Sequence, residues 1–435
     1  MFPLPSQKFA SLFTIIALSF SIFLYVVLPI IPNMKEFYPA AQLTPRPATT
    51  SEASDPTADE WPMFHGSLNH TGVALTTPAT GSGAFWNYSG NCYFSSPAIA
   101  GGFMYLGSSN GSVLCLNAVT GALVWTYATR NYVESCPAVA GGRVFVGSDD
   151  NSTYCLNATT GAPVWKYTTN GSIISSPAVT GGRVYVGSND NNTYCLDATT
   201  GALVWNYTAP GIVSASPAVV NGHVYVGCSG VLDLEGTLLC LDATLGTLEW
   251  NYTSSMYLAS SPTVAGGMVY GGGRALFALD ASTGALKWAA NTSYTSDSSP
   301  AVASGMVFVG GKQELYAVNA STGAITWDHL IGSTVESSPA FAGGNVYVQC
   351  DDDLYALNAS TGELEWAFAG GGGDSSPAIA NGRVYVGAAG QIYCLPMVLI
   401  SQVEGYPFFS LCVAAAAGAC CSILLKKRKK VMKTS

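Results

Sequence analysis

A phrase built on Ser-Ser-Pro-Ala recurs eight times along the chain, and its spacing limits the possible folds more than any other feature. Successive prolines of the phrase lie 38 to 45 residues apart. They are Pro97, Pro137, Pro177, Pro217, Pro262, Pro300, Pro339 and Pro377. A period of this length is typical of propellers and solenoids. We therefore predict one repeat domain, although 435 residues would otherwise favour two or three domains.

Each repeat contains the signals of four short antiparallel strands. An apolar stretch leads to a pair such as Gly141-Gly142, which supplies the positive φ angles of a two-residue hairpin. An alternating run such as 183–187 follows, and after a polar turn comes a third strand such as 193–196. A Thr-Gly turn then precedes a fourth strand that carries tryptophan. Four strands in about 40 residues predict a propeller blade.

The tryptophan strands show how the ring closes. They carry Trp86, Trp125, Trp165, Trp205, Trp250, Trp288, Trp327 and Trp366. Trp86 precedes the first complete repeat, whereas the last repeat breaks at Pro396 without a tryptophan strand of its own. We predict an all-β fold, an eight-bladed β-propeller of four-stranded antiparallel blades with flanking hydrophobic helices. The N-terminal strand at 84–88 should pair with the strand around 392–395 and remove a free sheet edge.

Both ends of the chain are hydrophobic, and their flanking charges predict a topology. The segments are a signal peptide or signal-anchor helix at 1–36, a flexible Pro/Thr/Ser-rich stalk at 37–60, the propeller at 61–395, a linker at 396–405, a transmembrane helix at 406–425 and a basic tail at 426–435. An uncharged span followed by a basic cluster indicates a stop-transfer helix whose tail is cytoplasmic. We therefore expect a cell-membrane protein with an extracellular propeller.

Twelve Asn-x-Ser/Thr sequons agree with export, because N-glycosylation needs an exposed asparagine in a translocated chain. They begin at Asn69, Asn87, Asn110, Asn151, Asn157, Asn170, Asn191, Asn206, Asn251, Asn291, Asn319 and Asn358. Several lie in a repeated Asn-Ala-Ser/Thr-Thr-Gly turn, where asparagine also suits the backbone. Between residues 61 and 395 there are 20 acidic and 8 basic side chains. Such an acidic surface repels phosphate backbones, so no nucleic-acid partner is expected.

The repeated phrase Asn/Asp-Ala-x-Thr-Gly-x-x-x-Trp resembles the PQQ-like β-propeller repeat family, which includes quinoprotein alcohol dehydrogenases and an outer-membrane assembly-factor propeller. The resemblance covers about 61–395, and the opening segments 61–65 and 70–72 are similar to the lead-in of such chains. It implies that each tryptophan packs against the neighbouring blade, so that the tryptophan set is structural.

The resemblance alone does not imply enzymatic activity. The family's dehydrogenases have an adjacent cysteine pair, a Ca²⁺ site and a catalytic Asp, together with longer insertions. Here the only adjacent cysteines are Cys420 and Cys421, in the predicted transmembrane helix, and the insertion at 231–236 is short. We therefore expect no catalytic residues and no bound PQQ. The alternative is a quinone (PQQ)-dependent oxidoreductase.

Histidines and cysteines add little chemistry. The four histidines lack metal-ligand spacing, and His223 occupies a position that is arginine in other repeats. One repeat position holds Cys115, Cys155, Cys195, Cys240 and Cys394, which are predicted to be small buried packing residues. A disulfide among Cys92, Cys136, Cys228 and Cys350 is open, because sequence alone does not assign one.

One set of acidic residues stands out three positions before the repeat prolines. It consists of Glu134, Asp297, Glu336 and Asp374. If this position begins the innermost strand, the carboxylates lie at one mouth of the central channel, with Glu134 several blades from the others. They would suit Ca²⁺ or a cationic ligand, and the alternative is a solvated acidic rim. We predict a non-catalytic extracellular binding or scaffold propeller that presents a surface to protein or glycan partners, with no cofactor except possible Ca²⁺.

Overall fold

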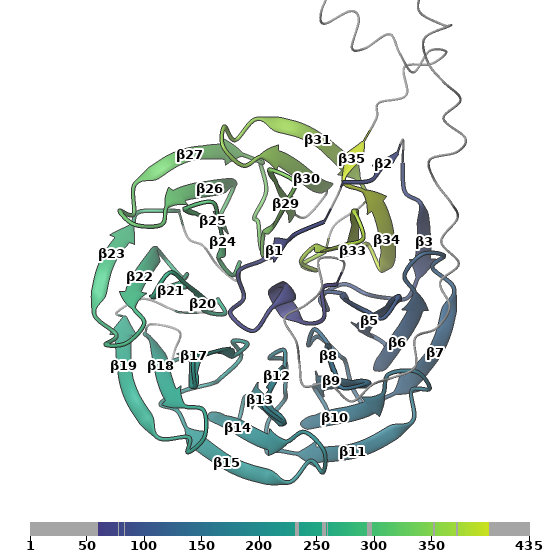
Figure 1. Cartoon of the computed structure of the whole chain (residues 1–435), viewed down its shortest axis with the longest axis vertical. Helices are drawn as coiled ribbons and strands as arrows, with labels where there is room; N and C mark the ends of the chain where they lie inside the picture. The colour runs from purple at the N-terminus through teal and green to yellow at the C-terminus, as the bar shows by residue number, and fades with distance from the viewer. Residues whose placement is uncertain are drawn as a thin grey trace, which may run out of the picture. The chain divides into compact units, whose positions relative to one another are not determined.

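The computed structural model describes residues 60–399, except 77, 82, 231–234, 255–257, 259, 294–297, 351–352 and 371–372. In this part of the chain, antiparallel four-stranded sheets surround a central axis as the eight blades of a propeller (Figure 1). The predicted all-β class and the blade count are therefore confirmed. The predicted segments 1–36, 406–425 and 426–435 lie outside the described residues, as do the predicted stalk up to residue 59 and the predicted linker from residue 400. Among the residues that are described, no helix is long and apolar enough to span a membrane.

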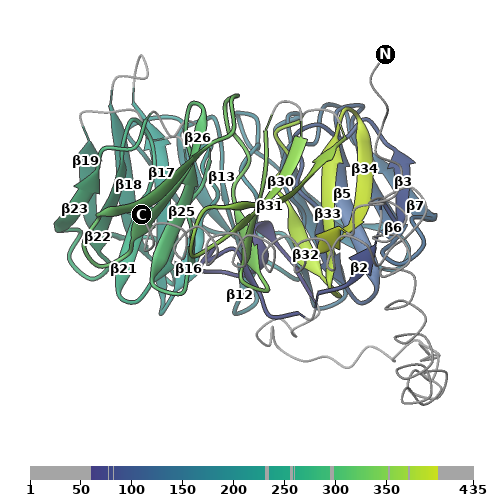
Figure 2. The same cartoon turned by 90° about the horizontal axis from the view of Figure 1, so that it is seen from above.

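We number the blades in chain order, and Figure 2 shows them standing side by side around the ring. Blade 1 is β4 (Ala98–Ala100), β5 (Phe103–Ser108), β6 (Ser112–Asn117) and β7 (Leu123–Ala128); blade 2 is β8 (Ala138–Ala140), β9 (Arg143–Ser148), β10 (Ser152–Asn157) and β11 (Pro163–Thr168); blade 3 is β12 (Ala178–Thr180), β13 (Arg183–Gly187), β14 (Asn192–Asp197) and β15 (Leu203–Thr208); blade 4 is β16 (Ala218–Val220), β17 (His223–Ser229), β18 (Gly236–Asp242) and β19 (Leu248–Ser254).

The second half of the ring repeats this order up to the last blade. Blade 5 is β20 (Thr263–Ala265), β21 (Met268–Gly271), β22 (Leu276–Asp280) and β23 (Leu286–Ala290); blade 6 is β24 (Ala301–Ala303), β25 (Met306–Gly310), β26 (Glu314–Asn319) and β27 (Ile325–Leu330); blade 7 is β28 (Ala340–Ala342), β29 (Asn345–Gln349), β30 (Asp353–Asn358) and β31 (Leu364–Ala369); blade 8 is β32 (Ala378–Ala380), β33 (Arg383–Ala388), β34 (Gln391–Pro396) and β3 (Trp86–Ser89).

Tryptophan side chains join each blade to the next. In every blade the indole Nε1–H donates to a backbone carbonyl of the following blade, at 2.9 to 3.2 Å. The pairs are Trp86 to Ala118, Trp125 to Ala158, Trp165 to Ala198, Trp205 to Ala243, Trp250 to Ala281, Trp288 to Ala320, Trp327 to Ala359 and Trp366 to Met397. The tryptophans therefore have a structural role: each links its blade to the next.

The Asx-Ala-x-Thr-Gly turn explains why the acceptor carbonyl sits where the indole reaches it. In blade 1, Asn117 Oδ1 accepts the backbone N–H groups of Val119 and Thr120, which fixes the turn around the acceptor. Gly121 has φ of +72°, and a Cβ atom there would lie 2.6 Å from the Trp86 ring. Glycine is therefore needed both for the backbone conformation and for the approach of the indole.

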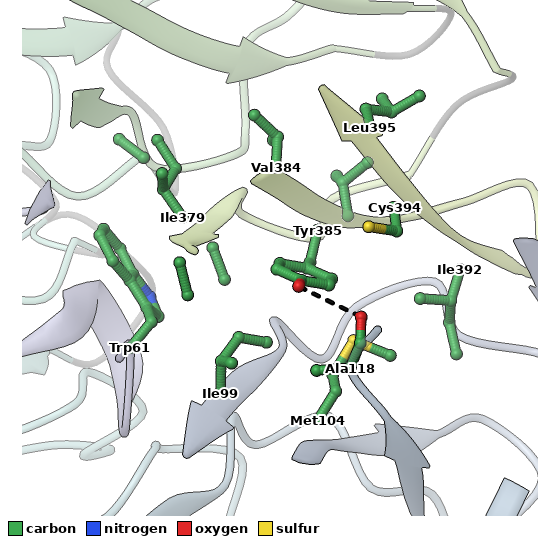
Figure 3. Close-up of a cluster of buried hydrophobic side chains, with 14 of the residues drawn as sticks. Trp61, Ile99, Met104, Ala118, Ile379, Val384, Tyr385, Ile392, Cys394 and Leu395 are labelled. Atoms are coloured by element: carbon green, nitrogen blue, oxygen red, sulfur yellow. Dashed lines mark hydrogen bonds between the residues drawn. The ribbon is translucent and has the colours of Figure 1, made fainter. Parts of the chain in front are cut away.

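The two ends of the described chain meet in blade 8. β3 pairs antiparallel with β34, with Trp86 opposite Cys394. Blade 8 also contacts blade 1 through buried side chains and through the Tyr385 hydroxyl, which donates to Ala118 O at 3.2 Å (Figure 3). Two short parallel pairs add contacts of the N-terminal part of the described chain: β1 (Val73–Ala74) pairs with β28 of blade 7, and β2 (Thr80–Gly81) pairs with β35 (Val398–Leu399).

We predict that β3 is needed to close the ring. Deleting 81–90 should leave β34 as a free edge and lower the free energy of unfolding, because blade 8 loses its outer strand and the Trp86 bond to Ala118 in blade 1. Denaturant unfolding and light scattering measure the two effects. Trp205→Ala is the control, because it removes the same type of contact between internal blades and leaves β34 paired. A monomeric deletion variant of unchanged stability would contradict the role of β3.

Candidate functional site

The N-terminal segment 61–72 crosses one end of the central channel. Figure 1 shows this segment in purple at the centre of the ring. Its backbone carbonyls accept N–H groups from the innermost strands of six blades at 2.7 to 2.9 Å. The acceptor and donor pairs are Trp61 with Ile99, Pro62 with Val139, Leu68 with Val219, Asn69 with Val264, Thr71 with Val302 and Gly72 with Phe341. The segment therefore provides hydrogen-bond acceptors for backbone N–H groups at the inner edges of the blades, which would otherwise face the channel.

Two buried histidines stabilise this segment. The Nδ1–H of His65 donates to His70 O at 2.9 Å, and the Nδ1–H of His70 donates to Pro262 O at 3.0 Å. Burial lowers the pKa of His65 to about 4 and the pKa of His70 to about 3, although both hydrogen bonds oppose the shift. His65 Nε2 is buried and has no hydrogen-bond partner. Both imidazoles are therefore neutral at physiological pH.

Above this segment the channel contains a cavity of about 420 Å³. Phe64 of the short 3-10 turn η3 (Phe64–Gly66) lines it, together with Phe94, Ile174 and Ala215. Its other lining side chains are polar or acidic. They are Ser96, Glu134, Cys136, Ser176, Ser214, Ser216, Ser261, Ser299, Glu336, Ser338, Asp374 and Ser376. No lysine, arginine or histidine is among the described lining residues.

A circle of serine hydrogen bonds builds the cavity wall. At the position before the repeat proline, the backbone N–H of seven of the eight repeats donates to the Oγ of the same position in the next blade, at 2.9 to 3.0 Å. The eighth step, from Ser96 in blade 1 to blade 2, meets Cys136, which has no Oγ. The donor and acceptor pairs are Cys136 to Ser176, Ser176 to Ser216, Ser216 to Ser261, Ser261 to Ser299, Ser299 to Ser338, Ser338 to Ser376 and Ser376 to Ser96. The last bond crosses the junction between blades 8 and 1.

Three of the four predicted acidic residues line this cavity: Glu134, Glu336 and Asp374. Asp297 lies outside the described residues. Burial raises the pKa of Glu134, and the carboxylates of Asp149 and Asp374 raise it further. The expectation that Glu134 stands several blades away is wrong, because the order of blades is circular. Blade 8, which carries Asp374, and blade 2, which carries Glu134, both adjoin blade 1.

The other predicted residues are spread over the ring. None of the twelve sequon asparagines is buried. Asn157, Asn319 and Asn358 use Oδ1 to accept backbone N–H groups in their turns. The nine cysteines of the described residues are all buried and free, which confirms the packing role predicted for the shared position and shows no disulfide in this part of the chain.

Sequence reasoning missed the crossing segment, the paired histidines and the serine circle. The serine circle had a visible signal, because a polar side chain recurs beside a buried proline in nearly every repeat. The crossing segment had a weaker signal: the lead-in 61–72 is not part of the repeat, and its backbone carbonyls accept most of its hydrogen bonds from the blades. Every residue has a backbone carbonyl, so hydrogen bonds to carbonyls do not require particular side chains and are not visible in the sequence.

The chain matches the model of a protein family, the outer membrane protein assembly factor BamB. The matches cover residues 73–176, 109–232, 212–334 and 275–396, and therefore most of the propeller. No curated protein sequence matches the chain.

Several solved structures share the fold. BamB from Moraxella catarrhalis is 20% identical, with a TM-score of 0.61, over 74% of this chain and 99% of that one. A europium-containing methanol dehydrogenase is 15% identical, with a TM-score of 0.68, over 76% and 90%. Quinohemoprotein alcohol dehydrogenase from Comamonas testosteroni is 16% identical, with a TM-score of 0.66, over 80% and 82%. At these identities the likeness concerns the fold alone.

The buried histidines predict a loss of stability in acid. Unfolded histidine takes up a proton near pH 6.5, whereas folded His65 and His70 do so only near 4 and 3. The unfolded state therefore binds more protons below pH 6.5, and each residue should lower the free energy of unfolding by about 2 kcal/mol between pH 7.5 and 5.

Urea unfolding at a series of pH values measures this loss. In His70→Asn the Nδ2–H group can replace the bond to Pro262 O without titrating, so the pH dependence attributable to the pair should fall by about half. An identical pH dependence in the variant would contradict the assignment.

Proposed function

The chain belongs to the family of the outer membrane protein assembly factor BamB, and on this basis we propose that it is a non-catalytic binding propeller. Its acidic channel mouth takes a cationic ligand, either a divalent cation or a basic segment of a protein partner. The observation that carries the proposal is the convergence of Glu134, Glu336 and Asp374 on one cavity. Like charges that converge repel one another, and a bound cation relieves that repulsion.

The family description supports a protein partner over a glycan, because an assembly factor acts on other proteins. A basic side chain of such a partner would meet the three carboxylates and the serine hydroxyls together. The crossing segment 61–72 occupies the other end of the channel, so a ligand would enter from the acidic mouth. Electrostatic attraction there would steer a basic partner and would weaken as salt is added.

The alternative is a quinone-dependent oxidoreductase, and the fold shared with two dehydrogenases is the observation that favours it. The lining of the cavity does not fit that cofactor. Pyrroloquinoline quinone carries carboxylate groups, whereas the described lining residues offer carboxylates and hydroxyls without a cationic side chain. A buried anion placed beside carboxylates of the same charge, with no cationic side chain among the described lining residues, is strongly disfavoured. We therefore propose no step through the quinone.

The cellular setting is also a proposal. The hydrophobic segments 12–31 and 406–425, the basic residues after 425 and the exposed or half-exposed sequon asparagines support an extracellular propeller anchored in the cell membrane. In that setting the acidic mouth would meet extracellular cations and the basic regions of neighbouring surface proteins.

Calorimetric titration of Ca²⁺ into the full chain tests the cation site. We expect saturable heat from the wild type and at least about tenfold weaker binding by Glu134→Gln/Glu336→Gln/Asp374→Asn, since the ligand charges are removed. Because the pKa of Glu134 is raised, binding should strengthen with pH as this carboxyl group ionises.

Asp328→Asn/Glu363→Gln/Glu365→Gln is the matched control, because it removes three exposed charges from the outer part of blades 6 and 7. This control should bind Ca²⁺ like the wild type. Equal heats from the cavity variant and the wild type would refute the cation site. Saturable dye-linked turnover after addition of the quinone and Ca²⁺ would refute the non-catalytic assignment instead.

The proposed topology predicts which parts of the chain a protease can reach. Protease added to intact cells should remove propeller epitopes and spare a tag placed after Ser435, because the basic tail is expected inside. Immunoblotting for both epitopes, with a cytoplasmic protein as the integrity control, measures the outcome. A protected propeller together with a digested tag would show the opposite orientation.

A further inference from the structure

Blade 4 brings together three side chains of the kinds that bind transition metals. His223 lies on β17, Cys240 on β18 and Glu249 on β19, and their ligand atoms all lie within 4.8 Å of one another. His223 Nδ1 is 2.6 Å from Glu249 Oε2, and Cys240 Sγ is 3.5 Å from the same oxygen. The imidazole and the carboxylate are about one-third exposed, whereas the thiol is buried.

The strand register explains why these side chains meet. His223 is paired with Asp242, and Cys240 with Tyr225, so that His223 and Cys240 are diagonal neighbours on one face of the blade. The register between β18 and β19 shifts after Cys240, which is opposite Trp250, and Leu241 is opposite Leu248. Glu249 is the extra residue of this bulge. Bulges redirect side chains in this way.

The other blades provide an internal comparison for the same three positions. Blades 2, 3 and 8 also have a cysteine at the position of Cys240. At the position of His223, these three blades have Arg143, Arg183 and Arg383. The guanidinium groups of these arginines donate to carbonyls of the next blade. The position of Glu249 holds Val164 in blade 2 and Val204 in blade 3.

Blade 4 thus differs from blades 2 and 3 by two changes beside the shared cysteine position. A cation that would repel a metal ion is replaced by an imidazole, and an apolar side chain is replaced by a carboxylate. Blade 7 has an acidic residue at the bulge, Glu365, but combines it with Asn345 and Ala356. Among the described residues, His223, Cys240 and Glu249 are the one set with metal-binding geometry.

We propose that His223, Cys240 and Glu249 bind one Zn²⁺ ion, with a fourth position open to water. Nitrogen, thiolate and carboxylate donors at about 2.0 to 2.3 Å suit this borderline-soft ion. Donors around a tetrahedral ion of this size lie about 3.3 to 3.8 Å apart, which the Cys240–Glu249 distance of 3.5 Å already matches. The His223–Glu249 pair opens from 2.6 Å by side-chain rotation at the half-exposed edge.

Metal titration of the full chain tests the site. Zn²⁺ is added in competition with a chromophoric chelator, and Co²⁺ is used separately because a bound thiolate gives it a charge-transfer absorption. We expect one ion per chain and a thiolate–Co²⁺ band. His223→Arg and Glu249→Val, which install the residues found in other blades, should each weaken Zn²⁺ binding by more than about tenfold.

Two cysteine variants complete the design. Cys240→Ala should abolish the Co²⁺ band and still fold, because alanine fills the same position as Ala278, Ala317 and Ala356 in blades 5, 6 and 7. Cys155→Ala, at the corresponding position beside Arg143, should keep full binding. The absence of a thiolate–Co²⁺ band in the wild type, or equal binding by His223→Arg/Glu249→Val, would overturn the proposal.

Discussion

The hydrogen bond from a tryptophan indole to a backbone carbonyl of the next blade is the interaction on which the ring depends. One four-stranded sheet does not bury both of its faces, and stability comes from stacking neighbours. In six blades a tyrosine hydroxyl donates to the same carbonyl as the indole, which uses both lone pairs of the oxygen. The turn that presents this carbonyl also contains the glycine that admits the indole. One short phrase of sequence thus fixes how consecutive blades sit against each other.

The same phrase explains how much of the fold could be predicted from the sequence. The period, the Gly-Gly pairs and the eight tryptophans specify local structure and a contact between neighbours, so blade number and strand order follow. The position of Glu134 was misjudged because distance was counted along the chain, whereas Ser376 and Ser96, 280 residues apart, are bonded neighbours. The crossing of the channel by segment 61–72 was not predicted because its hydrogen bonds to the blades are accepted mainly by backbone carbonyls.

The functional features arise from departures from the repeat. Glu134, Glu336 and Asp374 occupy a position that holds Phe94, Ile174 or Ser214 in other blades, and the shared geometry brings the three carboxylates to one cavity. The sequence indicated the acidic position, but the ring was needed to show which of its members face one another. The set in blade 4 was overlooked for a related reason. His223 was compared with arginine at its own position, while Glu249 and Cys240 lie on other strands and meet it only through a bulge.

The crossing segment also constrains the order in which the domain is completed. Its first contact is with Ile99 in blade 1, but Gly72 O accepts the N–H of Phe341 in blade 7. The residues synthesised first in the propeller therefore cannot make all their hydrogen bonds until nearly the whole domain exists. Such long-range contacts are associated with slow folding. The hydrogen bonds of this segment therefore link six blades at once, so that a complete set of these bonds requires those blades to be in place around the channel.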